Sequence, residues 1–379
     1  MNILQQLEQL GQSIWYDNIS RSLCTGGGLK RMVDQGLLGV TSNPTIFEKA
    51  ISGSSEYDRQ IRDLVRTVPT ITVEETIRVL MISDIQMAAD ILRPVYERTS
   101  GRDGYVSVEV TPSKAHDTQA TIEEARLLWK RVARKNLMIK IPATREGLPA
   151  VQQAIAEGIN VNVTLIFSVE RYREVAEAYW GGLEKRAGRG ESLAQVASVA
   201  SVFVSRIDTL VDDLLRARAS NASSDVAARC RELAGKAAVA NTRLVYQAFK
   251  EIFFTPSFDS LRQKGAAYQR PLWGSTSAKN PSYPDLLYVE TLIGPHTVNT
   301  VPPSTYEAIL DHGKAVATVE EDPDGSRKVL ADIGELGVDI ARVTQQLEDE
   351  GVAAFAKSFD TLNVTVEKKR RIAVSGVTS

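Results

Sequence analysis

Short apolar runs alternate with longer stretches of helical periodicity along this chain, and this alternation restricts the fold more than any other feature. Between helical patterns such as residues 73–92, where apolar residues fall on one stripe, the chain carries runs rich in Val, Ile, Leu and Tyr. Eight such runs occur, at residues 14–16, 38–41, 105–110, 137–141, 161–167, 200–205, 271–275 and 288–292. Repeated strand and helix units predict a parallel sheet.

Eight parallel strands with intervening helices fit a closed (β/α)8 TIM barrel, whose usual size is about 250 residues. A doubly wound open sheet is the alternative, but Gly26-Gly27-Gly28 lacks both the glycine spacing of a dinucleotide site and the P-loop lysine. We therefore predict an α/β barrel with additional N- and C-terminal helices. Residues 1–379 are expected to form a single domain, with 303–379 a C-terminal helical extension packed on the barrel.

The charge balance argues against nucleic acid and membrane partners. The 379 residues include 47 acidic and 45 basic side chains, and the basic ones are dispersed. No window approaches the ~18 apolar residues of a membrane span, and the first residues lack a basic region followed by an apolar stretch. Cys24 and Cys230 are too few for a disulfide framework. We expect a soluble cytoplasmic protein; small phosphorylated substrates are compatible with this balance.

Lys140 interrupts the apolar run Leu137-Met138-Ile139-Lys140-Ile141-Pro142. Taking an ammonium group out of water lowers its pKa, so a lysine inside a strand can be a neutral amine that attacks a carbonyl group. A lysine on a strand can equally serve only to discourage aggregation of strand edges. This segment alone does not decide between the two interpretations.

Polar residues stand at the carboxyl ends of most predicted strands, the ends that form the active face of such barrels. They are Asp17 after the first strand, Asn43 after the second, Glu109 on the third, Lys140 on the fourth, Asn162 and Thr164 on the fifth, and Ser201 to Arg206 on the sixth. The convergence of so many ionisable and amide groups favours a functional site.

Each of these residues also has a purely structural interpretation. Asp17 can cap a helix, and Asn43 before a proline can shape a turn. Arg206 can pair with Asp208 at the surface, where an ion pair contributes little. Glu109 is harder to explain in this way, because an isolated buried carboxylate needs a partner.

A lysine amine with such neighbours suggests imine chemistry. A neutral amine adds to a ketone to give a carbinolamine and then an iminium ion, with proton transfers from a carboxyl group and usually an ordered water. Glu109 and Thr164 are candidates for holding that water. Asp17 is a candidate base for carbon–carbon cleavage, and the amides of Asn43 and Asn162 are candidates for hydrogen bonds to substrate hydroxyls.

Two motifs in combination resemble the transaldolase family: Gly39-Val40-Thr41-Ser42-Asn43-Pro44-Thr45-Ile46-Phe47 and Met138-Ile139-Lys140-Ile141-Pro142-Ala143-Thr144. Further similar segments extend the resemblance over nearly the whole chain, and the length of the C-terminal helical region is similar to that of larger bacterial members. The resemblance implies a Schiff-base enzyme of the pentose phosphate pathway. Such an enzyme moves a dihydroxyacetone unit from sedoheptulose 7-phosphate to glyceraldehyde 3-phosphate, giving erythrose 4-phosphate and fructose 6-phosphate, without metal or organic cofactor.

The same resemblance implies roles for individual residues. Lys140 matches the Schiff-base lysine, Asp17 the acid/base for cleavage, and Glu109 with Thr164 the pair that holds water. The substrate-binding positions are matched by Asn43, Asn162, Ser201, Phe203, Arg206 and Ser275, with Arg206 at a phosphate ligand. Many members carry an arginine two positions after the serine of strand 7, where this chain has Ser277. We expect Lys279 to supply the missing charge, with Arg270 as a second candidate.

Two other functions remain open at this point. A fructose 6-phosphate aldolase resembles transaldolase in fold and lysine chemistry but releases free dihydroxyacetone. Those aldolases carry tyrosine where this chain has Phe203, which favours transfer. A non-catalytic phosphosugar-binding protein would not need Lys140 with Asp17 and Glu109. The expected partners are phosphorylated ketose and aldose sugars, with the protein acting as a monomer or homodimer.

Overall fold

The computed structural model describes residues 1–375, and over these residues eight parallel strands close into a barrel in the order of the sequence. This confirms the predicted (β/α)8 architecture. The strands are β1 (Gln12–Asp17), β2 (Gly39–Thr41), β3 (Tyr105–Glu109), β4 (Leu137–Pro142), β5 (Val161–Ile166), β6 (Ser198–Phe203), β7 (Arg270–Gly274) and β8 (Thr297–Val301).

The register of the strands determines which residues lie side by side in the barrel. Glu109 on β3 pairs with Lys140 on β4, and Lys140 pairs in turn with Asn162 on β5. Between β1 and β2, Trp15 lies opposite Gly39, where an added Cβ would come within 2.5 Å of the indole ring. Glycine is therefore required at 39 for the first two strands to pack around this tryptophan.

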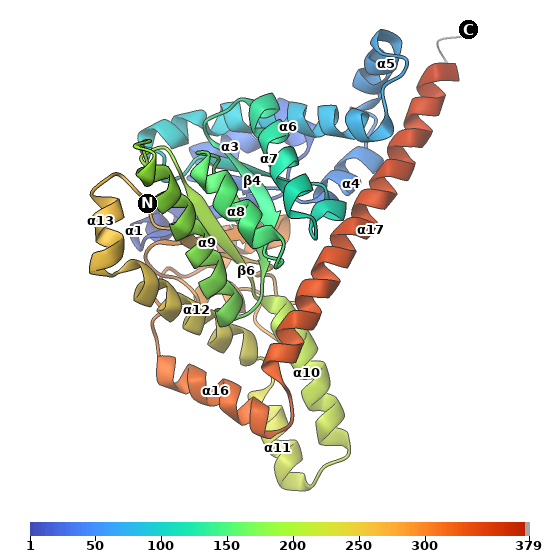
Figure 1. Ribbon diagram of the computed structural model, residues 1–379. Helices are drawn as coiled ribbons and strands as arrows, with labels where there is room; N and C mark the ends of the chain where they lie inside the picture. The colour runs from blue at the N-terminus through green and yellow to red at the C-terminus, as the bar shows by residue number, and fades with distance from the viewer. Residues whose placement is uncertain (376–379) are drawn as a thin grey trace.

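Helices surround the barrel and follow most strands (Figure 1). Before β5 they are α1 (Ile3–Gln9), α2 (Arg21–Thr25), α3 (Gly28–Asp34), α4 (Pro44–Ser52), α5 (Asp58–Thr67), α6 (Val73–Arg98), the 3₁₀ turn η1 (Pro112–Lys114), α7 (Thr118–Val132) and α8 (Gly147–Ala156). After β5 they are α9 (Val169–Gly188), α10 (Ser205–Ser220), α11 (Ser224–Leu233), α12 (Ala237–Phe253), α13 (Pro256–Arg262), α14 (Leu287–Glu290), α15 (Pro303–His312), α16 (Pro323–Glu335) and α17 (Ile340–Ser375).

The last strand differs from its prediction. Residues 288–292 were expected to form it, but this stretch lies in and just after α14, and β8 begins at Thr297. The true strand is more polar than the predicted one because its polar side chains have partners. Thr297 accepts a hydrogen bond from Gln12, and Asn299 accepts one from Thr276.

The helix α17 spans 36 residues and runs past several other elements of the fold. Figure 1 shows it extending from beside α10 to α5, and it packs against α4, α5, α6, α10 and β5. Because β5 belongs to the barrel and α4 begins at the end of β2, this helix lies against the carboxyl end of the barrel.

Two further features bear on the sequence predictions. Within residues 1–375, none of the helices combines the length and apolar character needed to cross a bilayer. Cys24 and Cys230 are both buried free thiols. Burial, with the charge of Asp84 nearby, raises the pKa of Cys24 to about 12, which favours the thiol over the nucleophilic thiolate near neutral pH.

Candidate active site at the carboxyl end of the barrel

Lys140 lies on β4 with its side chain buried among polar and aromatic partners. Its Nζ is 3.3 Å from Oε2 of Glu109 and donates a hydrogen bond of 3.2 Å to the carbonyl oxygen of Ser42. The ring of Phe355, from α17, has its centroid 5.6 Å from the same nitrogen. The amine thus contacts β3, the connection between β2 and α4, and α17, and it also lines a pocket.

Glu109 and Thr164 lie on the strands on either side of β4. Glu109 is 5% exposed, and burial raises the pKa of its carboxyl group, while the charge of Lys140 acts in the opposite direction. The hydroxyl of Thr164 is buried and makes no hydrogen bond to the part of the chain that the structure describes. Both groups therefore retain hydrogen-bonding capacity for a small polar species near Lys140.

Local irregularity of β5 accompanies Thr164. The pairing of β5 with β6 shifts register between Val163 and Ile166, and Leu165 has a left-handed backbone with φ of 61°. A branched, buried residue in that conformation is strained, and such strain is found at functional sites.

Asp17 ends β1 with its carboxylate held by a neighbouring strand. Its Oδ1 accepts a hydrogen bond of 2.7 Å from the hydroxyl of Thr41, which also contacts the hydroxyl of Thr300. Burial raises the pKa of Asp17, and the positive charges of Lys140 and Lys279 and the hydrogen bond from Thr41 partly offset this. A carboxylate with a raised pKa beside a pocket is suited to exchanging protons.

Amide and hydroxyl groups form a chain below the pocket. Ser201 donates a hydrogen bond of 2.6 Å to Oδ1 of Asn162, whose Nδ2 donates one of 3.1 Å to Ser107. Asn43 lines the pocket and also caps α4, since its Oδ1 accepts a hydrogen bond from the backbone of Ile46. Asn43 therefore lines the pocket and caps a helix, where the structural interpretation of the sequence had expected it to shape a turn.

Cations and hydroxyls gather on another side of the pocket. Arg206, in the first turn of α10, lies 5.2 Å from the centroid of the Phe203 ring and forms no ion pair within residues 1–375, contrary to the alternative pairing with Asp208. Ser275, with φ of 54°, shares a hydrogen bond with Ser205. Lys279 donates a hydrogen bond of 2.6 Å to Ser277.

The pKa of Lys279 reflects this crowding. Partial withdrawal of its ammonium group from water and the nearby charge of Arg206 lower the pKa of Lys279, and Asp17 opposes the shift. Two positive groups that repel each other at one side of a pocket are typical of a site for an anionic group.

One pocket brings together most of the predicted site residues. Its lining includes Asp17, Asn43, Lys140, Ser201, Phe203, Arg206, Ser275 and Lys279. The remaining three, Glu109, Asn162 and Thr164, contact these residues or pair with their strands. All eleven therefore cluster at the carboxyl end of the barrel.

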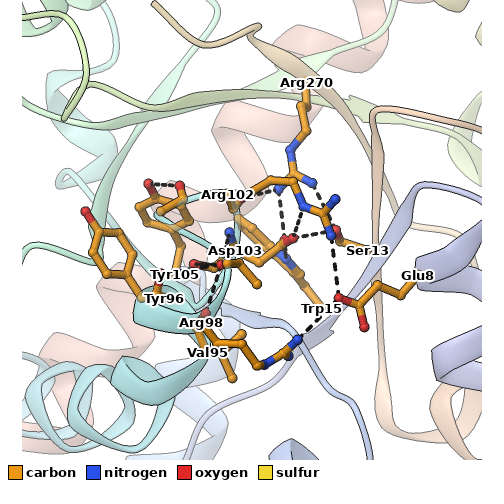
Figure 2. A network of polar contacts seen from close by, with 12 residues as sticks. Glu8, Ser13, Trp15, Val95, Tyr96, Arg98, Arg102, Asp103, Tyr105 and Arg270 are labelled. Carbon is orange, nitrogen blue, oxygen red and sulfur yellow. Dashed lines mark hydrogen bonds and ion pairs between the residues drawn. The ribbon is translucent and has the colours of Figure 1, made fainter. Parts of the chain in front are cut away.

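Arg270 is the exception, and its candidacy for the phosphate site is wrong. It begins β7 and therefore lies at the opposite end of the barrel from Gly274 and Ser275. Figure 2 shows its guanidinium in a buried network, where Nη2 lies 2.9 Å from Oδ1 of Asp103. Lys279 lines the pocket and is left as the candidate for the second cation.

Comparison with known proteins decides the family. The family model for transaldolase/fructose-6-phosphate aldolase matches residues 14–366. The chain belongs to this transaldolase family. The match confirms the resemblance seen in the two motifs around Asn43 and Lys140.

Individual transaldolase relatives match almost the whole chain. The "Transaldolase" of Thermobifida fusca is 50% identical over 361 residues, covering 95% of this chain and 96% of the relative. The "Transaldolase 2" of Nostoc sp. is 46% identical over 378 residues, covering 98% of both chains. The "Transaldolase" of Acidothermus cellulolyticus is 48% identical over 367 residues, covering 96% of both.

Four residues at this transaldolase-family site received no role from the sequence. Thr41 holds Asp17, the carbonyl of Ser42 holds Lys140, and Thr300 and Phe355 line the pocket. Thr41 and Ser42 stand next to Asn43 at the end of a predicted strand, and this position could have indicated that they belong to the site. Phe355 gives none, because an apolar residue on a helix normally indicates packing.

Proposed function

We propose that this protein is a transaldolase that transfers a dihydroxyacetone unit from sedoheptulose 7-phosphate to glyceraldehyde 3-phosphate through an imine on Lys140. The products are erythrose 4-phosphate and fructose 6-phosphate. The observation that carries the proposal is the position of Lys140, a buried amine lining a pocket, with the carboxylate of Glu109 3.3 Å away and Asp17 on the same pocket. Full-length similarity to proteins named transaldolase supports it.

Imine formation requires Lys140 and a nearby proton carrier. The lysine nitrogen adds to the ketone carbon of the donor, and the carbinolamine then loses its hydroxyl group as water. We assign these proton transfers to Glu109, because burial favours its protonated form and it contacts the amine. Thr164, with its free hydroxyl, is assigned to orienting the small polar species that passes the proton.

Carbon–carbon cleavage requires a base at the other end of the reacting unit. Asp17 takes the proton of the donor hydroxyl, the carbon–carbon bond breaks towards the iminium, and the aldose leaves while an enamine remains on Lys140. Attack of the enamine carbon on the aldehyde of the acceptor reverses these steps, with Asp17 returning the proton. Asn43, Asn162 and Ser201 are assigned to the hydroxyls of the three-carbon unit.

We assign the phosphate group of the substrates to Arg206 and Lys279, with Ser275 as a hydroxyl donor. These groups lie on one side of the pocket, and Lys279 stands near the position where many family members place an arginine. Phosphate recognition by two cations also explains why their mutual repulsion is tolerated in the free protein.

We further propose that residues 1–379 act as one domain and that the protein is cytoplasmic. The single domain is supported by Phe355, which the C-terminal extension contributes to the pocket. The cytoplasmic location is supported by the two free thiols and by the phosphorylated substrates, which belong to intracellular carbon metabolism.

Chemical trapping tests the proposal. Borohydride added to the protein with fructose 6-phosphate should add the mass of a reduced dihydroxyacetone unit to the peptide that contains Lys140, and Lys140→Met should gain no such mass. Folded, wild-type protein that fails to form the adduct would rule the mechanism out. A coupled assay with and without erythrose 4-phosphate distinguishes transfer from aldol cleavage: a donor consumed equally fast without acceptor would identify an aldolase.

A further inference from the structure

The C-terminal helix α17 places one aromatic ring over the reactive lysine. Phe355 is 4% exposed, lines the pocket, and has its ring centroid 5.6 Å from Nζ of Lys140. The other groups in contact with this nitrogen, the Glu109 carboxylate and the Ser42 carbonyl, are polar. Phe355 is thus the apolar cover of the amine, and it comes from a segment outside the eight strand and helix units.

Contacts on both sides of Phe355 fix the helix over the pocket. Before it, Glu348 pairs with Arg171 at 3.2 Å. After it, the hydroxyl of Ser358 lies 2.7 Å from that of Thr45, in the helix that Asn43 caps. Near the end of α17, Lys369 pairs with Asp58 of α5 at 2.6 Å.

Close approach to the barrel also depends on a small residue one turn before the ring. A Cβ added at Gly351 would lie 2.8 Å from Cδ2 of Leu165 and 3.7 Å from Nη1 of Arg206. The helix therefore lies directly against the bulged part of β5 and near the guanidinium at the phosphate side. Phe355, one helical turn further, is carried into the mouth of the pocket.

We propose that Phe355 is a shielding residue of the active site, which keeps water from the imine and enamine on Lys140 and so favours transfer over release of dihydroxyacetone. This inference rests on the proposed function. It assigns to the C-terminal extension a role in the outcome of the reaction, in addition to its packing on the barrel.

The chemistry that Phe355 opposes can be written step by step. The enamine carbon, which holds the electron pair left when the aldose departs, takes a proton from solvent and becomes an iminium ion. A water molecule then adds its oxygen to the iminium carbon, the carbon–nitrogen bond breaks, and Lys140 leaves as an amine. The proton taken up in the first step returns to solvent, and the net result is release of free dihydroxyacetone. Each step needs water beside Lys140, the place that the Phe355 ring covers.

Two substitutions test the shielding role through the fate of the three-carbon unit. Phe355→Ala opens the cover, whereas Phe355→Leu keeps an apolar side chain. Each variant is given fructose 6-phosphate, and free dihydroxyacetone is measured without acceptor and the rate of transfer with erythrose 4-phosphate. We expect the ratio of release to transfer to rise about tenfold in Phe355→Ala, the effect of a barrier difference of about 1.4 kcal/mol. In Phe355→Leu we expect the ratio of release to transfer to rise less than in Phe355→Ala.

Leu362→Ala is the matched control, because Leu362 is a fully buried residue of α17 two turns beyond Phe355 and outside the pocket lining. It should lower the melting temperature without changing the ratio of release to transfer. A purely structural role for Phe355 would make its variants behave like Leu362→Ala, and that result would overturn the inference. If Phe355→Ala does not fold, Phe355→Val takes its place, because the shorter side chain also uncovers the amine, and an unchanged ratio in that variant decides against shielding.

Borohydride trapping separates failure of this inference from failure of the proposed function. Wild-type protein that forms no adduct on Lys140 would refute the underlying mechanism. Wild-type protein that forms the adduct and transfers the unit, combined with an unchanged ratio in both Phe355 variants, would refute only the shielding role.

Discussion

Nζ of Lys140 lies 3.3 Å from Oε2 of Glu109, and the two residues are paired across neighbouring strands of the barrel. The pairing is an outcome of backbone register, so the distance is fixed by β3 and β4 and not by flexible loops. Burial raises the pKa of Glu109, and the charge of Lys140 opposes that shift. A proton shared within such a pair is available for the steps that form and break an imine.

Replacing Glu109 with glutamine should slow imine formation while keeping the site's shape. We expect the rate at which the borohydride adduct appears on Lys140 to fall by about 10²–10⁴, the usual contribution of a positioned acid or base. Rapid-quench trapping with fructose 6-phosphate measures this rate. An unchanged rate in the folded variant would remove Glu109 from the proton transfers.

The assignment of Asp17 as the base for cleavage can be tested separately from imine formation. Asp17→Ala should still form the trapped imine, while turnover falls by about 10²–10⁴ because the base for cleavage is lost. Full turnover in this variant would contradict the assignment.

The hydrogen bond from Thr41 allows a milder test of the same carboxylate. That bond lowers the pKa of Asp17, so Thr41→Val should raise this pKa further. Because the base must be ionised for donor cleavage, the acid limb of the pH–rate profile should move to higher pH in Thr41→Val. A profile identical to that of the wild type would show that Asp17 does not govern that limb.

The assignment of Lys279 to the substrate phosphate can be tested with phosphorylated and unphosphorylated acceptors. Lys279→Met should raise KM for erythrose 4-phosphate by about 10–100-fold, the effect of losing a hydrogen bond to a charged group, and leave KM for unphosphorylated erythrose unchanged. Lys279→Arg should retain most of the affinity. An equal change for both aldoses would mean that Lys279 acts on the shape of the pocket and not on the phosphate.

The alternation of apolar runs and helical stretches predicted seven of the strands well, because strands buried on both faces are continuous apolar segments. The eighth was mislocated because Thr297 and Asn299 are polar and find partners across the barrel, in Gln12 and Thr276. Such pairing is a property of the closed structure and leaves no trace in the local sequence.

The sequence predicted the position of those site residues that stand at strand ends, and it missed residues that distant segments bring to the pocket. Arg270 could have been excluded from the sequence, since it begins a strand whose other end carries Ser275. Phe355 could not have been found, because its contact with Lys140 joins residues from β4 and α17 that only the fold brings together.

The network at the amino end of the barrel should determine stability and not activity (Figure 2). Asp103 is fully buried, accepts hydrogen bonds from Ser13 and Trp15, and pairs with Arg270. Asp103→Asn leaves the Arg270 charge without its partner, so the free energy of unfolding should fall by about 3–5 kcal/mol. Urea unfolding measures this loss, and kcat of the folded fraction should be unchanged.

Two further variants check the origin of that loss. Adding Arg270→Met to Asp103→Asn should recover part of the stability, because no unpaired charge is then buried. Glu8 pairs with Arg102 at the rim of the same network. Glu8→Gln should lower the free energy of unfolding by less than about 1 kcal/mol. A double variant no more stable than Asp103→Asn would mean that packing, and not charge, sets the cost.

The buried carboxyl group of Asp208 should make the stability of the protein depend on pH, independently of catalysis. Asp208 is 1% exposed, and its carboxylate accepts hydrogen bonds from the backbone of Ala238 and from Tyr288. Burial raises the pKa of Asp208 from 3.8 to about 6, in spite of these hydrogen bonds and with a further increase from the charge of Asp212.

Between pH ~4 and pH ~6 the folded protein therefore keeps a proton on Asp208 that the unfolded chain has released. The folded state binds more protons in this window, so the free energy of unfolding decreases as pH rises through it and increases on acidification. Asp208→Asn cannot titrate and lacks this contribution. Relative to Asp208→Asn, the wild type should gain up to about 3 kcal/mol as pH is lowered from ~7 to ~4. Urea unfolding of both proteins across this range measures the difference, in which the other titrating groups cancel. Parallel stability curves would show that the pKa of Asp208 is not raised in the folded state.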